Sequence, residues 1–395
     1  MKIYFYIFLG FLVFPACVSG GTASEDYEFP GIERIVAVGD LHGDFEGYAD
    51  VLEAAGIRDR DGNWIGGAAH LVQTGDITDR GPDSRKIIDD LRKLAKKAKK
   101  AGGRVHTLIG NHEMMNMLGD LRYVHPGEYE AFQTPNSKTR QDDYYTRSET
   151  AVRDEAKQNG IEFSSEAFRE QWYQDYPLGY VEHRLEWGQP KGEYYRWTIK
   201  NPVAVKINDT LFLHAGISPL DSGLSIKELN EKVIEGIKTF PDPAANFLFA
   251  EDSALWYRGL ALNDEETEAP HLEELLDGFG VARIVLGHTP TGGVVLPRFD
   301  GRVVMNDVGI GEHYGGNRAF LLFEDGQWWG VHWGEKMKLP TDDRTLLVYL
   351  REVAALSPNP AVIEKTILEL ESRMEPVPVS PGISSESRAP VLMDR

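Results

Sequence analysis

Residues 35–43 read Ile35-Val36-Ala37-Val38-Gly39-Asp40-Leu41-His42-Gly43, and this stretch decides the fold. Its first four residues are apolar and mostly β-branched, which is typical of a buried strand. The glycine-flanked turn that follows carries Asp40 and His42, two residues apart. Because an aspartate and a histidine at one strand end can bind the same metal ion, the stretch joins a fold signal to a chemical one.

The same pattern occurs five times along the chain. Each time an apolar run stops at a turn that carries Asp, Asn or His, and the turns are Gly39–Gly43, Gly75–Gly81, Gly110–Glu113, His214–Gly216 and Gly287–His288. These turns supply six candidate metal ligands, which are Asp40, His42, Asp76, Asn111, His214 and His288. Mixed nitrogen and oxygen donors suit Fe, Zn or Mn, whereas Ca²⁺ prefers oxygen alone. We therefore expect a site for two divalent ions.

Strands and helices alternate in the first part of the chain. Apolar runs predict strands at 35–38, 68–74 and 105–109, and helical periodicity predicts helices over 45–55 and 83–100. This order is typical of an α/β layer whose parallel strands end along one edge. Ligand-bearing turns at such an edge form a crevice, the usual place for a site in α/β proteins.

Hairpins are predicted in the second half of the chain. Asn208-Asp209, Asp300-Gly301 and Asp325-Gly326 each separate two apolar runs, and a turn of this kind is a strong hairpin signal. We expect the three hairpins to form a second sheet, largely antiparallel, packed on the first. The expected fold class is mixed α/β.

Residues 118–200 differ from the rest of the chain, because they are rich in Tyr, Trp, Arg and Glu and carry no ligand-bearing turn. We predict helices here at 146–157 and 165–175, forming an insertion near the crevice. The expected organisation is a catalytic domain over 30–335 that contains this insertion, C-terminal helices at 346–356 and 361–373 within residues 340–374, and a disordered tail at 375–395, rich in Pro and Ser.

The charge of the chain excludes some classes of partner. With 42 Lys and Arg against 62 Asp and Glu, the formal net charge is −20. Nucleic-acid phosphates and anionic membranes need a basic surface, so a general nucleic-acid or membrane-surface binder is not expected. The basic run from Arg92 to Lys100 has helical spacing and is interpreted as a solvated helix face.

The N-terminus predicts export. Lys2 precedes an apolar run from Ile3 to Phe14 that is too short to span a bilayer as a helix, so residues 1–20 are interpreted as a signal segment. Two forms of processing fit it. Val18-Ser19-Gly20 offers small residues for cleavage before Gly21, whereas Phe14-Pro15-Ala16-Cys17 is similar to a lipoprotein box that would lipidate Cys17. The expected location is periplasmic or secreted, with a lipid anchor as the second form.

Two metals about 3.5–4 Å apart would lower the pKa of a shared water toward about 7 and supply hydroxide as the nucleophile. His112 follows Asn111 directly and is the candidate general acid, with Asp79 to orient it. Arg80 offers a planar fork that matches phosphate oxygens. Glu113 is expected to be structural.

In these five turns, taken in order, the chain resembles the metal-dependent phosphoprotein phosphatases, and most closely their Shewanella-like branch. The likeness runs from about Ile35 to His332. It implies a central β-sandwich of two mixed sheets flanked by helices, and a dinuclear site. It does not imply the regulatory subunits of the eukaryotic enzymes, because the insertion after Met114 differs from theirs and Ile217 follows the His214 turn.

The resemblance also implies roles for individual residues. One metal would be held by Asp40, His42 and Asp76, and the other by Asp76, Asn111, His214 and His288. His112 with Asp79 would form the general-acid pair, and the substrate phosphate would contact Arg80, Asn111 and a second arginine, for which Arg258 is the candidate. Tyr314, in the glycine-rich stretch 309–316, is expected on a loop beside the site.

The function that follows is hydrolysis of a phosphomonoester on a protein or peptide. Hydrolysis of a dinucleoside polyphosphate or another small phosphoester on the same fold stays open as an alternative. A catalytically inactive module that binds phosphopeptides is the alternative from a different class. The choice of substrate is assigned to residues 118–200 and the segment around Arg258.

Overall fold

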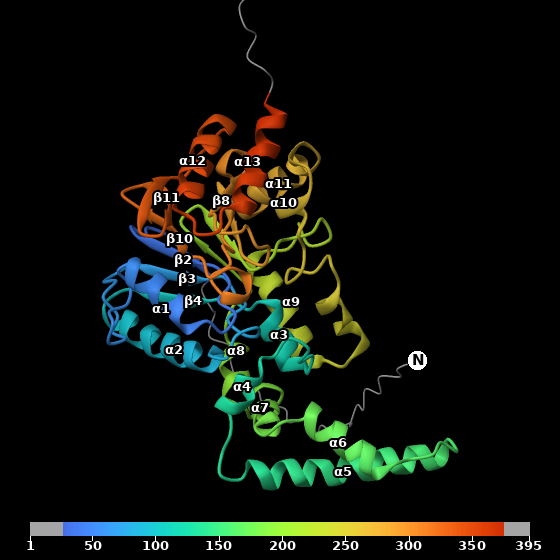
Figure 1. Ribbon diagram of the computed structural model, residues 1–395. Coiled ribbons are helices and arrows are strands. Elements are labelled where there is room, and N and C mark those ends of the chain that lie inside the picture. The colour runs from blue at the N-terminus through green and yellow to red at the C-terminus, as the bar shows by residue number, and fades with distance from the viewer. Residues whose placement is uncertain (1–26, 375–395) are drawn as a thin grey trace, which may run out of the picture.

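The computed structural model describes residues 27–374. The predicted signal segment, Cys17 and the predicted disordered tail lie outside these residues. Two six-stranded mixed sheets pack together with helices on their outer surfaces (Figure 1), as the mixed α/β sandwich expected from the sequence requires. Within the described part of the chain, no helix is long and apolar enough to cross a membrane.

The first sheet contains the predicted parallel layer. Its strands, in spatial order, are β12 (Glu335–Lys338), β11 (Gln327–His332), β10 (Ala319–Glu324), β2 (Ile35–Val38), β3 (His70–Gln73) and β4 (Arg104–Thr107). β2, β3 and β4 pair in parallel. They are linked through α1 (Phe45–Ala54) and α2 (Ser84–Lys100). α2 buries Ile87, Ile88, Leu91 and Leu94 and leaves its lysines exposed, as predicted for the basic run.

The second sheet corrects one expectation. Its spatial order is β1 (Glu28–Phe29), β5 (Ala204–Ile207), β6 (Thr210–Leu213), β7 (Arg283–Leu286), β9 (Val303–Met305) and β8 (Leu296–Arg298). The prediction of a largely antiparallel sheet is wrong, because β1–β5, β6–β7 and β7–β9 pair in parallel. The third hairpin, β10–β11, joins the first sheet beside β2. A turn signal specifies pairing within one hairpin, whereas the neighbours of that hairpin are chosen by tertiary packing.

The core lies between the two sheets. Phe212 of β6 and Trp328 of β11 meet across it, with ring centroids 6.3 Å apart. Outside the second sheet, α9 (Ile226–Thr239) packs on β5. At the C-terminus, α12 (Asp343–Leu356) and α13 (Ala361–Arg373) form a smaller apolar cluster that includes Val294, confirming the two predicted helices.

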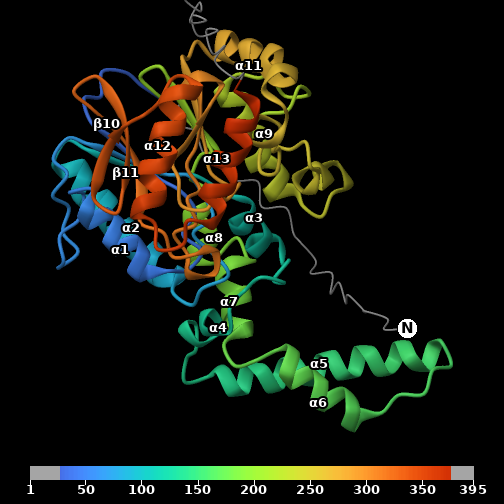
Figure 2. The ribbon, with the colours of Figure 1, turned by 45° about the horizontal axis from the view of Figure 1, so that its top comes forward.

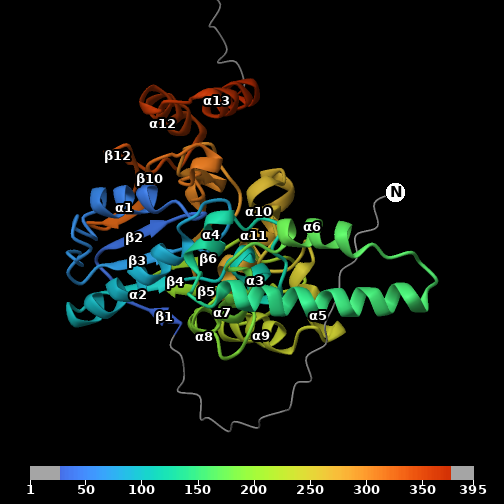
Figure 3. The same ribbon diagram turned by 60° about the horizontal axis from the view of Figure 1, so that its bottom comes forward.

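The insertion is helical, as predicted, and part of it projects from the body of the molecule. It follows α3 (Asn111–Leu118) and comprises α4 (Pro126–Ala131), α5 (Ser137–Gln158), α6 (Ser165–Asp175), α7 (Tyr180–Trp187) and α8 (Glu193–Thr198). Figures 2 and 3 both show α5 and α6 extending outward together, and we call residues 137–175 the arm. α6 has its predicted bounds, whereas α5 begins at Ser137, well before the predicted start at 146.

Candidate active site

The five predicted turns meet at one edge of the two sheets. They follow β2, β3, β4, β6 and β7 in turn. Backbone hydrogen bonds fasten them to one another: the amides of Leu41 and His42 donate to the carbonyl of Asp76 at 2.9 and 3.0 Å. The amide of His288 donates to the Asp40 carboxylate at 3.0 Å, which joins the two sheets at the site. Residues from distant parts of the sequence are therefore held in one buried cluster.

The backbone at this edge adopts unusual conformations. Five residues other than glycine have positive φ angles, namely His42 (46°), Asp76 (55°), Asp79 (73°), Arg80 (70°) and His288 (66°). Such conformations cost on the order of 1–3 kcal/mol each and persist only where the surroundings enforce them. Their concentration in the ligand-bearing turns marks this edge as a functional site.

Asp76 lies at the centre of the cluster. Its Oδ1 is 3.4 Å from Nε2 of His214, and its Oδ2 is 4.0 Å from Nε2 of His42 and 3.8 Å from Nε2 of His112. Two sets of side chains could each hold a metal ion, with ligand atoms within 4.8 Å of one another, and the sets are His42, Asp76 and His112, and Asp76, His214 and His288. Asp76 belongs to both sets, in accord with a bridging position.

The histidine ring nitrogens test whether metal ions fit here. Nδ1 of His42 bonds the carbonyl of Thr78 at 3.1 Å, and Nδ1 of His214 bonds that of Thr74 at 2.9 Å. These bonds place the protons on Nδ1, so each Nε2 faces the cluster as an electron-pair donor. Nε2 of His214 is also 2.8 Å from Oδ1 of Asn111. Nε2 of His288 is buried and has no hydrogen-bond partner among the described residues. Converging electron-pair donors fit divalent cations.

The electrostatics of the cluster are anionic at its centre. Burial opposes the ionisation of Asp76, yet the surrounding His214, His112 and His42 hold its pKa well below the usual range. Burial raises the pKa of Asp40, and the neighbouring carboxylate of Asp307 adds to the rise. A carboxylate as crowded as that of Asp40 is stabilised by a cation beside it.

His112 and Asp79 form a close pair. Nδ1 of His112 is 2.6 Å from Oδ2 of Asp79, and both side chains are buried. Burial lowers the pKa of His112, but Asp76 and the bond to Asp79 outweigh it and raise that pKa to about 9. The imidazole therefore carries a proton at neutral pH, and the structure gives it the environment predicted for a general acid.

Glu113 is structural, as predicted. Its carboxylate accepts hydrogen bonds from the amides of Gly110 and Asp76 at 2.9 Å and from those of Ile77 and Thr78 at 2.8 and 3.1 Å. It thereby fastens the turn after β3 to the start of α3. This one side chain holds two ligand-bearing turns in register.

The two candidate phosphate-binding arginines flank the cluster. The guanidinium carbon of Arg80 lies 3.9 Å from the centroid of the Tyr123 ring, and its buried Nε has no partner within residues 27–374. Arg258 is fixed by bonds from Nη1 to the carbonyl of His288 at 2.9 Å and to Oγ1 of Thr289 at 2.8 Å. Arg258 thus lies against the turn that carries His288.

Tyrosine rings line the mouth of the site. The Tyr314 ring is 4.7 Å from that of His42, as expected for a loop residue beside the site, and the Tyr123 ring is 5.3 Å from that of His112. Tyr123 was not predicted from the sequence. It belongs to the insertion, and its carbonyl accepts a bond from the amide of Arg80 at 3.0 Å.

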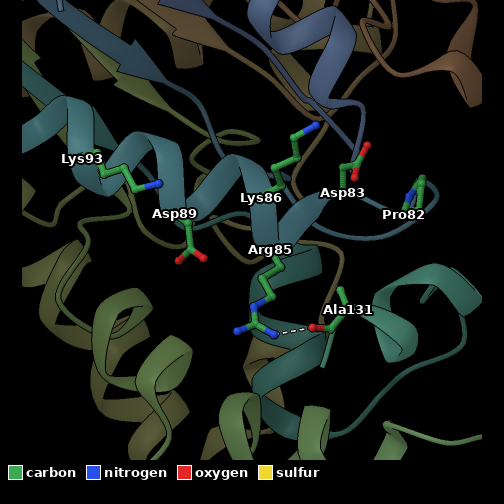
Figure 4. Close-up of a pocket in the computed structure, with 7 residues that line it drawn as sticks. All are labelled: Pro82, Asp83, Arg85, Lys86, Asp89, Lys93 and Ala131. Carbon is green, nitrogen blue, oxygen red and sulfur yellow. Dashed lines mark hydrogen bonds between the residues drawn. The ribbon is translucent and has the colours of Figure 1, made fainter. Parts of the chain in front are cut away.

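The insertion also holds the helix that follows Arg80. Glu128 of α4 accepts a 2.5 Å bond from the amide of Ser84, the first residue of α2. Arg85 donates a hydrogen bond to the carbonyl of Ala131, and Figure 4 shows this bond in a pocket at the start of α2. That pocket carries both signs of charge, since Lys86, Lys93, Asp83 and Asp89 also line it. The base of the insertion is therefore fastened to the Asp79–Arg80 loop.

Asp307 is a further buried carboxylate at the site, and it was not predicted from the sequence. It follows β9, and its Oδ1 accepts a bond from the amide of Gly309 at 3.1 Å. Burial raises its pKa to about 7. The backbones pack closely here, because a Cβ on Gly39 would lie 2.9 Å from Cα of Asp307. The signal was present as one more apolar run that ends in Asn306-Asp307.

Four further histidines lie in contacts outside the cluster. Nδ1 of His70 is 3.0 Å from Nε2 of His106, and both are buried. Nε2 of His332 accepts a hydrogen bond from the amide of Val295 at 3.0 Å. Nδ1 of His125 caps the start of α4. These contacts account for the four side chains in terms of packing and capping.

Comparisons with known proteins agree with this geometry. Residues 33–292 match the calcineurin-like phosphoesterase family. Shewanella-like protein phosphatase 2 of Arabidopsis thaliana is 30% identical over 290 residues, covering 70% of this chain and 71% of that protein. An uncharacterised protein of Schizosaccharomyces pombe is 32% identical over 311 residues, covering 76% of this chain and 80% of that protein.

A solved structure extends the agreement to three dimensions. The cold-active protein-tyrosine phosphatase of a psychrophilic Shewanella superposes with a TM-score of 0.60 at 29% identity, covering 80% of this chain and 82% of that one. The ligand-bearing turns, the sandwich that carries them and these relatives lead to one assignment. The chain belongs to the calcineurin-like phosphoesterases and, within them, to the Shewanella-like protein phosphatases, and it is a metal-dependent phosphatase.

Proposed function

We propose that this phosphatase removes phosphate from phosphoproteins and that phosphotyrosine is its preferred substrate. The observation that carries the proposal is the cluster around Asp76, where Nε2 of His112 lies 3.8 Å from Oδ2 of Asp76 and Arg80 packs on the Tyr123 ring beside His112. The relatives named as protein phosphatases support a phosphoprotein substrate. The tyrosine rings beside His42 and His112 support an aryl phosphate, since aromatic rings pack favourably on one another.

Two divalent ions would be held by side chains that share Asp76. Asp40, His42 and Asp76 would hold one ion, and Asp76, Asn111, His214 and His288 the other. His112 also faces Asp76, but its Nδ1 is held by Asp79 at 2.6 Å, and we assign it to the general acid rather than to a metal ion. The nitrogen and oxygen donors suit Mn, Fe or Zn. When bound, the ions would activate water and neutralise charge on the phosphate.

The chain's own residues would then position the substrate and move one proton. Arg80, Arg258 and Asn111 would orient the phosphate oxygens, with the guanidinium planes matching their geometry. His112 would give the proton on its Nε2 to the leaving-group oxygen as the phosphorus–oxygen bond breaks. Asp79 would hold the Nδ1 side of the ring and stabilise its charge.

One assay tests the proposal. The purified protein with Mn²⁺ is offered phosphotyrosine, phosphoserine and phosphothreonine peptides and a dinucleoside tetraphosphate, with His112→Asn as the inactive control. The expected result is turnover of all phosphopeptides, fastest for phosphotyrosine. Faster turnover of the dinucleoside tetraphosphate would assign the site to small phosphoesters. Binding of phosphopeptides without turnover would indicate an inactive binding module.

We further propose that the chain is exported through residues 1–20, on the basis of their sequence alone. Mass spectrometry of the mature N-terminus distinguishes the two forms of processing. A terminus at Gly21 would indicate ordinary cleavage, whereas a lipidated Cys17 would indicate a membrane-anchored lipoprotein. A Cys17→Ser variant serves as the control, and an unprocessed N-terminus would contradict export.

A further inference from the structure

Asn116 occupies a buried position one helical turn after His112 on α3. Its side chain is 1% exposed. Nδ2 of Asn116 donates to Oδ1 of Asp79 at 2.9 Å and to the carbonyl oxygen of His112 at 2.9 Å. It also lies 3.4 Å from Oγ1 of Thr78. A single amide therefore contacts both members of the general-acid pair.

The two oxygens of Asp79 have different partners. Oδ2 faces Nδ1 of His112 at 2.6 Å, and Oδ1 receives the amide of Asn116. A carboxylate can rotate about its Cβ–Cγ bond, and a second donor on the other oxygen removes this freedom. Asn116 and His112 thus contact opposite oxygens of one carboxylate.

The insertion also contacts the backbone of Asn116. Nη1 of Arg184, on α7, donates to the carbonyl oxygen of Asn116 at 2.7 Å. Glycines make room for the guanidinium, because a Cβ on Gly119 would lie 3.0 Å from its Nη2 and one on Gly188 would lie 2.3 Å from it. The contact joins residues far apart in sequence and runs from the insertion to the acid pair.

We propose that Asn116 is a positioning residue for the general acid, holding Asp79 so that Nε2 of His112 is directed at the leaving-group oxygen, with Arg184 supporting it from the insertion. The inference rests on the proposed phosphatase function. The proton on Nε2 passes to the oxygen that keeps the electron pair of the broken phosphorus–oxygen bond. The Nδ1 proton stays on the bond to Asp79.

The dependence on the leaving group tests this role. Phenyl phosphate needs a proton on its departing oxygen, whereas 2,4-dinitrophenyl phosphate leaves without one. Asn116→Leu should lower kcat about tenfold or more on phenyl phosphate and less than about twofold on the dinitrophenyl ester. In the background of Asp79→Asn the same change should add little, because the two residues act in series. The metal content of the Asn116→Leu protein, measured by mass spectrometry, should equal that of the wild type.

Asn230→Leu is the matched control. Asn230 is also fully buried, and its amide bonds the backbone of Val203 and Ala204 on the second sheet. The change should lower stability and leave the ratio of the two kcat values as in the wild type. Should Asn116→Leu fail to fold, Arg184→Met removes only the outer bond and should show the same selective loss, about threefold.

The outcomes separate this inference from the proposed function. Wild-type turnover of both esters tests the phosphatase activity by itself. Given that turnover, a loss confined to phenyl phosphate supports the role of Asn116. Equal losses on the two esters, or a loss that adds fully to that of Asp79→Asn, would overturn it.

Discussion

The catalytic edge and the arm are built in opposite ways. At the edge, short strands end in buried turns, five residues have strained φ angles, and backbone hydrogen bonds join the turns. The arm consists of two helices packed on each other through aromatic rings, such as Tyr145 with Trp172 at 5.4 Å. Little of the arm is buried. The edge has the rigidity that chemistry needs, whereas the arm presents surface that can vary without disturbing it.

The base of the insertion belongs with the edge. Tyr123 bonds to Arg80, Glu128 bonds to the start of α2, and Arg184 bonds to Asn116 of α3. The arm lies farther out, as Figure 2 shows. The insertion therefore divides into a base that bonds to the body of the molecule beside the site and an exposed arm. Substitutions in the edge, the base and the arm should therefore affect different properties of the protein, and by different amounts.

The largest effect is expected at the centre of the edge. Asp76→Asn keeps the shape of the side chain but removes the charge shared by both metal sets. Turnover should fall by about 10³-fold or more, because charge stabilisation in such sites contributes this much. Bound metal, measured by mass spectrometry after dialysis, should fall as well. Full metal content with normal turnover would show that Asp76 does not bridge.

His112→Asn should separate the acid from the metals. Asp79 holds this imidazole, the proposed proton donor, so its loss should lower kcat by about 10²–10⁴-fold on a phosphopeptide. Metal content should stay at the wild-type level, since none of the proposed ligands is changed. Loss of metal in this variant would instead assign His112 to the metal set in which its Nε2 faces Asp76.

The substitution Arg80→Lys should have a smaller effect on catalysis than the two substitutions above. Lysine keeps the charge but loses the planar fork and the stacking on Tyr123. We expect kcat/KM to fall by about 10²-fold with bound metal unchanged. An unchanged kcat/KM would remove Arg80 from the phosphate site. Arg60→Lys, at an exposed position outside the ligand-bearing turns, is the control.

Much of the edge could be predicted from sequence because its signals are local. An apolar run that ends in Gly-Asp or Gly-Asn places a ligand at a strand end whatever lies beyond it, so all six ligand candidates meet in the structure. The pairing of β10–β11 with β2 could not be predicted in this way, since it depends on packing between segments almost 300 residues apart.

Asn116 and Asp307 escaped prediction for a physical reason as well. The place of Asn116 follows from its bond to Asp79, which no pattern along α3 reveals. Asp307 follows a strand of only three residues, which was assigned to a hairpin rather than to the site. The early start of α5 was missed because its first turns bury few apolar side chains, so a helical period is hard to see.

Shortening the arm should affect protein substrates alone. A variant in which a short Gly-Ser linker replaces residues 145–172 keeps Tyr123, Glu128 and Arg184. We expect kcat for an aryl phosphate to stay within about twofold, while kcat/KM for a phosphoprotein falls by about tenfold, the size of one modest contact surface. If the variant matches the wild type in kcat/KM for the phosphoprotein as well, the arm does not contact the substrate.

The smallest expected effect is on the folding stability of the base, and it appears only below about pH 6.5. His183 of α7 is 1% exposed and packs edge-on against Tyr129 and Phe132, with ring centroids 5.3 and 5.2 Å away. Burial lowers its pKa to about 3, and the neighbouring Arg184 cation adds to the shift. Between this value and an unfolded pKa of about 6.5, the unfolded chain binds a proton that the folded chain does not, so stability falls as the pH falls.

His183→Phe keeps an aromatic ring in that place and removes the titration. The free energy of unfolding of the wild type should drop by about 2 kcal/mol more than that of the variant between pH 7 and pH 5, at about 1.4 kcal/mol per pH unit below 6.5. Urea unfolding at the two pH values measures the difference. Equal losses in both proteins would mean that His183 is already protonated in the folded base, and that the base is more open to water than the edge it supports.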